Sequence, residues 1–160
     1  MFKAAPIIAT DKPALYAELA QQARGLLHDE TNLVANAANF AALAYHALPD
    51  INWCGFYFLD GGELVVGPFQ GKPACIRIAL GKGVCGAAAQ TRQTQLVRDV
   101  NAFDGHIACD AASNSELVVP IVRNGELIAV LDLDSPKTAR FTAEDEAGCV
   151  KLAEILAGAL

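Results

Sequence analysis

The spacing of the apolar residues changes twice along the chain, and this change restricts the fold more than any other feature. Towards the N-terminus apolar residues recur every three or four positions, which predicts helices over 13–28 and 33–47. The central part is instead rich in aromatic and β-branched residues between turn residues, which is typical of strands. Its clearest strand segments are 53–59, 63–69, 117–122 and 127–134. A last helix is expected to begin after Thr142, which can cap it.

Short connections between the strands indicate how they pair. Asp60-Gly61-Gly62 and Asn124-Gly125 are turn sequences, and each predicts an antiparallel hairpin. A short alanine-rich helix is expected over 83–92, and further short strands lie on either side of it. Helices at both ends of an antiparallel sheet make an α+β fold. The length of 160 residues fits one domain spanning 1–160.

Charge and cysteine content exclude several classes of function. The net charge is −6 and no run of basic residues occurs, so neither nucleic acid nor an anionic membrane is an expected partner. No signal peptide and no run of about 18 apolar residues is present, so no membrane span is expected. The odd number of cysteines, five, argues against a closed disulfide framework and favours a reducing compartment, the cytoplasm.

The five cysteines fall into two groups. Cys54 lies within an aromatic strand and Cys149 on a helix, so both are predicted to be buried packing residues. Cys75 lies in a loop, Cys85 at a helix start, and Cys109 in a long segment without periodicity. A thiol at a helix start or beside a histidine can have a lowered pKa and act as a nucleophile. Several loop thiols together indicate disulfide chemistry.

Two other interpretations of these segments are compatible with the residue types present. His106 together with the second group of cysteines could form a zinc site, but no C-x-x-C or H-x-x-x-H pair is present. The segment 81–86 matches G-x-G-x-x-G, the pattern of dinucleotide-binding loops. That pattern requires a βαβ unit, whereas the strands here form antiparallel hairpins. These glycines are therefore interpreted as a tight entry into a helix.

Acidic residues mark one end of the last hairpin. Asp132 and Asp134 are two positions apart on a strand and share a face. A two-residue turn at Asn124-Gly125 would place Glu116 on the opposite face, whereas a three-residue turn with a bulge at Gly125 places Glu116 opposite Asp132. The bulged register is preferred because it produces an unbroken apolar face. That face comprises Leu117, Val119, Ile121, Leu127, Ala129, Leu131 and Leu133.

The acidic end has two interpretations. Three carboxylates held close together repel, so at least one should keep its proton to a higher pH and could act as an acid. The alternative is a set of solvated acids at the end of a strand. Trp53 and Tyr57 also share a strand face, where they belong either to the core or to the wall of a small pocket.

Four motifs together resemble a known enzyme family. The segments 67–75, 81–86, 105–110 and 131–135 resemble those of the free methionine-(R)-sulfoxide reductases, which are built on a GAF domain. The resemblance covers nearly the whole chain, and its three cysteine motifs are specific in order and spacing. It implies a six-stranded antiparallel sheet flanked by N- and C-terminal helices.

The resemblance also implies roles for individual residues. Cys109 would be the attacking thiol, Cys75 the resolving thiol and Cys85 a third redox cysteine, while Trp53 and Tyr57 would form the pocket wall. The acids expected to bind the sulfoxide are Glu116, Asp132 and Asp134. Attack on sulfur would leave a sulfenic acid on Cys109, which would condense with Cys75 to a disulfide. A thioredoxin-like dithiol protein would then reduce it, without a bound cofactor or metal.

A second class of function stays open from the sequence. Many GAF domains are sensor modules that bind a small ligand or respond to redox state, and such a sensor is normally expected with an output domain. Turnover of free methionine sulfoxide with dithiothreitol distinguishes the enzyme from the sensor. The sequence leaves open the reductant, the redox state and whether the chain forms a homodimer.

Overall fold

The computed structural model describes residues 5–107 and 110–159. Six strands form one antiparallel sheet in the order β3-β2-β1-β6-β5-β4. The strands are β1 (Trp53–Asp60), β2 (Glu63–Gly71), β3 (Arg77–Ala79), β4 (Gln95–Val97), β5 (Ser115–Arg123) and β6 (Glu126–Ser135). The predicted six-stranded α+β architecture is confirmed.

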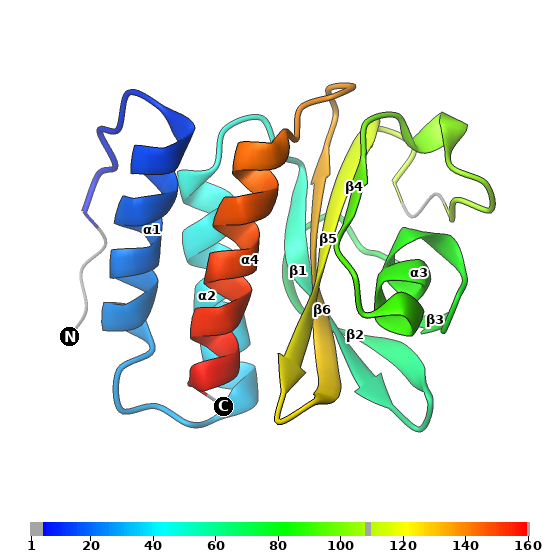
Figure 1. The fold of residues 1–160 in the computed structure, drawn as a ribbon, viewed down its shortest axis with the longest axis horizontal. Coiled ribbons are helices and arrows are strands. Elements are labelled where there is room, and N and C mark those ends of the chain that lie inside the picture. Colours follow the sequence, from blue (N-terminus) through cyan, green and yellow to red (C-terminus); the bar gives the residue numbers. More distant parts are fainter. Residues whose placement is uncertain (1–4, 108–109, 160) are drawn as a thin grey trace.

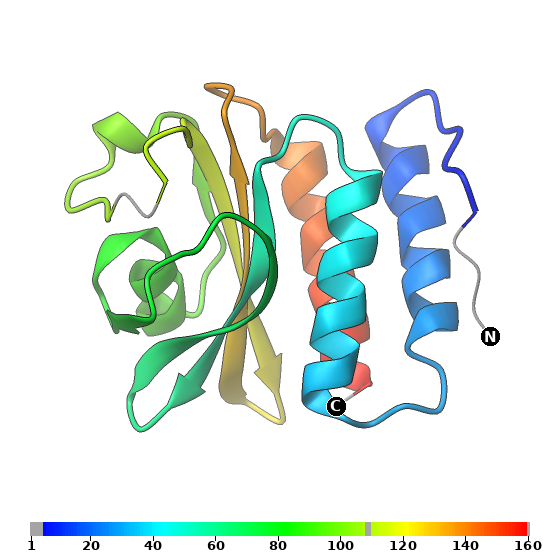
Figure 2. The ribbon, with the colours of Figure 1, turned by 180° about the vertical axis from the view of Figure 1, so that it is seen from behind.

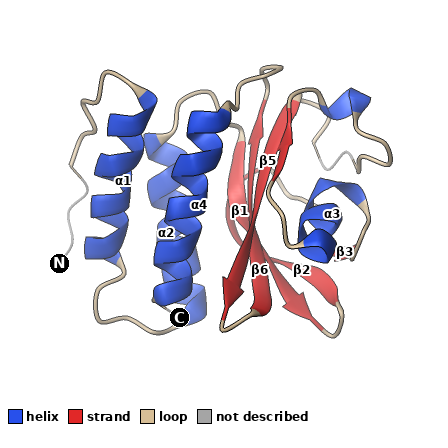
Figure 3. Cartoon of the chain, viewed as in Figure 1, coloured by secondary structure: helices blue, strands red, loops and turns tan. Residues whose placement is uncertain are grey.

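The helices are divided unequally between the two faces of the sheet. On one face α2 (Leu33–Ala47) and α4 (Ala143–Gly158) contact the strands, and α1 (Lys12–Leu26) packs outside them (Figure 1). On the other face lie the short α3 (Gly83–Thr91) and the loops around it, one of which contains a 3₁₀ turn (Figure 2). Figure 3 shows the resulting layers: helices, sheet, and a third layer of α3 and loops. No helix in the described part of the chain is long and apolar enough to cross a membrane.

The helix starts agree with the sequence prediction. The side chain of Asp11 accepts a hydrogen bond from the backbone N–H of Ala14, and that of Asn32 accepts one from Ala35. These bonds satisfy N–H groups that have no partner within a helix, so polar residues at these positions define where each helix begins. Thr142 is the N-cap of α4, as expected.

The sheet separates two apolar cores. The helix-side core contains the buried residues of α1, α2 and α4 together with Cys54, Phe56, Leu117 and Leu131. The pocket-side core, beneath α3, contains Trp53, Tyr57, Cys85, Val118 and Val130 among others. Cys54 and Cys149 are both fully buried, which confirms their predicted packing.

The register of the β5–β6 hairpin differs from the prediction. Arg123 pairs with Glu126 across a two-residue turn at Asn124-Gly125, and both turn residues have positive φ. The predicted bulge at Gly125 is therefore wrong. The extra residue is Ile128 instead, because Ile121 pairs with Ala129 while Val122 pairs with Leu127.

The displaced bulge leaves the three acids on the same face of the sheet but changes which residues lie opposite them on the neighbouring strand. Glu116 lies opposite Asp134, not opposite Asp132 as predicted, since the register beyond the bulge differs by two residues. A shift of two keeps every side chain on its face. Leu127 does change face: it packs in the pocket-side core, whereas Ile128 packs against the helix-side core. The predicted apolar face is correct except for Leu127.

The long segment between β4 and β5 contains a short 3₁₀ helix, η1 (Val100–Ala102), which the sequence did not indicate. Backbone hydrogen bonds hold the segment's end against the sheet: Val100 N donates to Asn114 O at 3.1 Å, and Asn114 N donates to Ser135 O at 2.7 Å. This places the loop over the acidic end of the hairpin. Cys109 itself lies outside the described residues.

Candidate active site

A pocket lies on the face of the sheet that α3 covers. Its floor comes from β1, β5 and β6, one wall from the start of α3, and the remaining walls from the loops before Cys75 and before β5. The lining includes most of the side chains singled out in the sequence: Trp53, Tyr57, Cys85, Glu116, Asp132 and Asp134. Residues that are far apart in the sequence thus meet at one place.

Glu116, Asp132 and Asp134 share the floor of this pocket. Glu116 is 7% exposed and Asp132 6% exposed. Burial, followed by repulsion from Asp132 and Asp134, raises the pKa of Glu116 well above its usual value. Burial raises the pKa of Asp132 to about 7, and burial and Asp132 raise that of Asp134. At least one of the three therefore keeps its proton near neutral pH, as expected for crowded buried acids.

No lysine or arginine in the described ranges forms an ion pair with these three carboxylates. The nearest basic group is His106, whose Nε2 lies 3.7 Å from Glu116 Oε2. Burial lowers the pKa of His106. A neutral imidazole beside a protonated carboxyl group is not an ion pair, and 3.7 Å is too long for a hydrogen bond. The pocket therefore keeps its excess of acidic groups.

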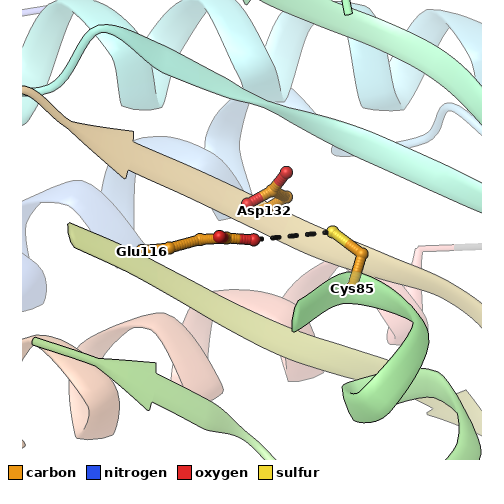
Figure 4. A group of neighbouring side chains, drawn as sticks. All are labelled: Cys85, Glu116 and Asp132. Carbon is orange, nitrogen blue, oxygen red and sulfur yellow. Dashed lines mark hydrogen bonds between the residues drawn. The ribbon is translucent and has the colours of Figure 1, made fainter. Parts of the chain in front are cut away.

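Cys85 projects from the first turn of α3 towards these acids. Figure 4 shows its thiol pointing at Glu116 on β5, with Asp132 on the neighbouring strand β6, and the Sγ atom donates to Glu116 Oε1 at 3.9 Å. Burial, together with Asp132 and Glu116, raises the pKa of this thiol well above its usual value. The lowered pKa that a helix start can give a thiol does not occur at Cys85, because burial and the nearby acids outweigh the helix.

Aromatic rings form the wall beside β1. Trp53 stacks on Tyr57 and on Phe69, with ring centroids 5.9 and 5.1 Å apart. The indole Nε1 donates a hydrogen bond to the backbone oxygen of Lys72 at 3.1 Å. Gly55 makes this stack feasible, because a Cβ there would lie 2.3 Å from Phe69 Cβ and 2.8 Å from the Trp53 ring. The wall is rigid, apolar and tied to the loop that precedes Cys75.

The loop before Cys75 and the described residues on either side of Cys109 meet at the pocket. Cys75 is partly buried against the pocket-side core and is disulfide-bonded. His106 and Asp110, on either side of the undescribed residues 108–109, both line the pocket. Lys72 Nζ lies 3.3 Å from both carboxylate oxygens of Asp110. The loop before Cys75 is thereby linked to the residue that follows Cys109.

Two residues at this junction were missed by the sequence reasoning. Asn52 donates its backbone N–H to Asp134 O at 3.0 Å and its side-chain amide to Ser113 Oγ at 3.1 Å. Lys72 makes the ion pair with Asp110 described above. An asparagine before a strand and a lysine in a glycine-rich loop are common surface residues, so neither carries a signal in the sequence alone.

One group of side chains at the site has a geometry compatible with metal binding. Cys85, Glu116 and Asp132 each place one ligand atom within 4.8 Å of those of the other two. Asp132 Oδ1 is buried and has no hydrogen-bond partner among the described residues. The donors are one sulfur and two carboxylate oxygens. No other such group occurs in residues 5–107 and 110–159.

Comparison with known proteins identifies the family. The GAF domain family matches residues 17–160. The free methionine-R-sulfoxide reductase of Escherichia coli is 53% identical over 142 residues, covering 89% of this chain and 86% of that protein. That of Saccharomyces cerevisiae is 43% identical, covering 91% and 86%. The structure of the enzyme from Neisseria meningitidis in complex with its substrate has a TM-score of 0.95 and 44% identity, covering 99% and 95%. The chain belongs to the GAF domain family, among the free methionine-R-sulfoxide reductases.

Proposed function

We propose that this protein reduces the R epimer of free methionine sulfoxide to methionine through a relay of thiols. The observation that carries the proposal is the pocket floor: three carboxylates with raised pKa values, without a lysine or arginine partner in the described residues, beneath an aromatic wall. A buried carboxylic acid that stays protonated near neutral pH can give a proton to an oxygen. The similarity to proteins named as such reductases supports the choice of substrate.

In the proposed first step the Cys109 thiolate attacks the sulfur of methionine sulfoxide. The acid cluster of Glu116, Asp132 and Asp134 protonates the sulfoxide oxygen as a transient bond forms between the two sulfurs. The oxygen then passes to the Cys109 sulfur, the bond between oxygen and the substrate sulfur and the transient sulfur–sulfur bond both break, and methionine is released, leaving a sulfenic acid on Cys109. The sulfur of the substrate is reduced by two electrons, and the sulfur of Cys109 is oxidised by two.

In the second step the Cys75 thiol attacks the Cys109 sulfenic acid, forming a disulfide and releasing water. A dithiol protein of the thioredoxin type, in the cytoplasm, then takes up the disulfide by exchange and restores both thiols. The sum is methionine sulfoxide plus a dithiol giving methionine, a disulfide and water. The ion pair between Lys72 and Asp110 supports this pairing, because it links the segments next to the two cysteines.

Cysteine variants test the relay. Cys109→Ser should abolish formation of methionine from free methionine sulfoxide, even with excess dithiothreitol, because a serine hydroxyl is far less nucleophilic near neutral pH. Cys75→Ser should still form one equivalent of methionine in a single turnover but should fail in thioredoxin-dependent cycling. Both are measured by quantifying methionine.

Cys149→Ala is the matched control, because it removes a buried thiol from the opposite side of the sheet. It should leave turnover intact. Substantial activity in Cys109→Ser would assign the attack to another thiol. Tight binding of methionine sulfoxide by the wild-type protein without any turnover would instead favour the sensor function.

A further inference from the structure

We infer that Cys85, Glu116 and Asp132 form a reversible binding site for a thiophilic divalent cation such as Zn²⁺, and that the bound cation excludes substrate from the pocket. The site is inhibitory and does not supply a metal for the reaction. The inference that the cation binds depends only on the geometry of the three residues. The inference that it inhibits rests on the proposed function.

The distances suit a single small ion. The three ligand atoms lie within 4.8 Å of one another, and Cys85 Sγ is 3.9 Å from Glu116 Oε1. Zinc binds sulfur at about 2.3 Å and carboxylate oxygen at about 2.0–2.2 Å, so two ligands of one ion are separated by about 3.5 Å. Side-chain rotations that move the ligand atoms by about 1 Å would complete the arrangement. The three groups come from α3, β5 and β6, so the backbone already presents them to a common point (Figure 4).

A second observation points to a cation at this place. Asp132 is 6% exposed, and its Oδ1 atom is buried without a hydrogen-bond partner among the described residues. A buried carboxylate oxygen without a partner costs free energy, which a bound cation would offset. Within the described residues, no lysine or arginine forms an ion pair with Asp132 or Glu116 that would offset this cost.

The donor types select the metal. One thiolate with two carboxylates fits zinc, whereas Mg²⁺ and Ca²⁺ prefer sites built from oxygen alone. His106 is a further donor near the cluster: its Nε2 atom lies 3.7 Å from Glu116 Oε2, but it is not within 4.8 Å of all three ligand atoms and would have to move to complete the coordination. On binding, Cys85 and Glu116 lose their protons to solvent, and the zinc ion forms bonds to the Cys85 sulfur and to the carboxylate oxygens of Glu116 and Asp132.

Zinc at this site would compete with methionine sulfoxide. The proposed reaction needs Glu116 and Asp132 to face the sulfoxide, and a bound cation would occupy the same oxygens. Inhibition should therefore be overcome by raising the substrate concentration. It should also be reversed by a chelator.

The decisive measurement is isothermal titration of reduced protein with zinc chloride, in a phosphine reductant that does not bind zinc tightly. The starting protein is Cys75→Ser combined with Cys109→Ser, which removes the other two cysteines of the proposed relay. One equivalent of zinc should bind. Adding Cys85→Ser should weaken the affinity by about 100-fold or more, since even a residue that only supports a ligand contributes 10–100-fold. Adding Cys149→Ala should leave the affinity unchanged, because Cys149 is a buried thiol on the other face of the sheet.

Two further readouts keep the test independent of folding and of activity. Asp132→Asn in the same starting protein should also weaken zinc binding, and thermal unfolding checks that each variant is folded. Cobalt in place of zinc should give a thiolate-to-metal charge-transfer absorption that disappears with Cys85→Ser. Absence of zinc binding in the starting protein, or binding that Cys85→Ser leaves unchanged, would overturn the inference. Wild-type protein that binds zinc through Cys85 but does not reduce methionine sulfoxide would overturn the proposed function and the competition, and leave the metal site standing.

Discussion

Two buried carboxylate–cysteine neighbourhoods lie on opposite faces of the same sheet, and they are built on opposite electrostatic principles. On the helix side Asp145 is fully buried beside Cys149. Its carboxylate accepts hydrogen bonds from Lys12 at 2.5 Å, Arg140 at 2.6 Å and Tyr16 at 3.0 Å. Burial alone would raise the pKa of Asp145, but the hydrogen bonds from Lys12, Arg140 and the Thr142 backbone N–H outweigh burial and lower it to about 2. This acid is charged and fully paired.

On the pocket side Glu116, Asp132 and Asp134 lie beside Cys85. Burial raises all three pKa values here too, and no pairing with lysine or arginine among the described residues reverses the effect. The difference between the two sides is therefore the supply of cations, not the depth of burial. An acid with ion-pair partners links the helices that carry them. A buried acid without such partners destabilises the fold and can take part in proton transfer.

The largest expected effect lies on the pocket side. Glu116→Gln or Asp134→Asn should lower the rate of methionine sulfoxide reduction by about 10²–10⁴-fold, the usual range for loss of a general acid. Neither change should lower the free energy of unfolding, because each removes a carboxyl group that has no ion pair with lysine or arginine among the described residues. Steady-state kinetics and urea unfolding of the same preparations check both statements. Full activity in both amide variants would show that the acids do not take part in the reaction.

Asp145→Asn should have the opposite profile. It leaves Arg140, which is 7% exposed, and Lys12, which is 32% exposed, without their anion. Breaking a buried ion pair from one side costs about 3–5 kcal/mol, and the partial exposure of Lys12 favours the lower end. The free energy of unfolding from urea titration should fall by about 3 kcal/mol. The rate per folded molecule should stay unchanged, and a loss of rate without a loss of stability would contradict the division between the two faces.

The two neighbourhoods should also respond oppositely to pH. The pKa of Asp132 is about 7 in the folded protein and 3.8 in an ordinary environment, so its contribution to stability is present below about pH 4 and lost as the pH rises through 7. Asp132→Asn does not suffer this loss. Relative to wild type it should therefore gain at least about 1 kcal/mol of unfolding free energy between pH 4 and pH 8.

Asp145 provides the contrast for this measurement. Its lowered pKa stabilises the fold above about pH 4, and that contribution is lost as the pH falls through 2. The stability deficit of Asp145→Asn should therefore shrink on acidification from pH 5 to pH 2. Urea unfolding over this range tests it, and parallel pH profiles for the two variants would refute the comparison.

The sequence predicted much of this layout because the relevant signals are local. Helical and strand periodicity located the main elements, and the parity of residue spacing put Glu116, Asp132 and Asp134 on one face. Parity does not determine the position of the bulge, however. Asn124-Gly125 suits a two-residue turn as well as a bulged one, and an extra residue at Ile128 restores the same face. Packing of Leu127 and Ile128 on opposite cores distinguishes the two registers, and this contact is absent from any local pattern.

The electrostatic character of the site was harder to predict than its residues. A helix start can lower the pKa of a thiol, but the pKa of Cys85 is raised by burial and by acids on strands that lie 31 and 47 positions away in the sequence. Asn52 and Lys72 were missed for a similar reason, since their partners Ser113 and Asp110 lie far along the chain. Long-range neighbours decide whether a polar residue is paired, and the sequence of one chain does not reveal them.

The smallest expected effect is on stability, and it distinguishes the contributions of Lys12 and Arg140, the two cations that contact Asp145. Lys12→Met removes the more exposed partner of Asp145 and leaves Arg140 in place. Partly exposed ion pairs contribute about 1 kcal/mol or less, since water already solvates the ammonium group. The free energy of unfolding should therefore fall by about 1 kcal/mol or less, well below the effect of Asp145→Asn, with no change in the rate. Arg140→Met is the matched control and should cost more, because Arg140 also donates its Nε–H to Pro49 O at 3.0 Å. A loss for Lys12→Met as large as that for Asp145→Asn would mean that Lys12, and not Arg140, is the cation that keeps Asp145 charged.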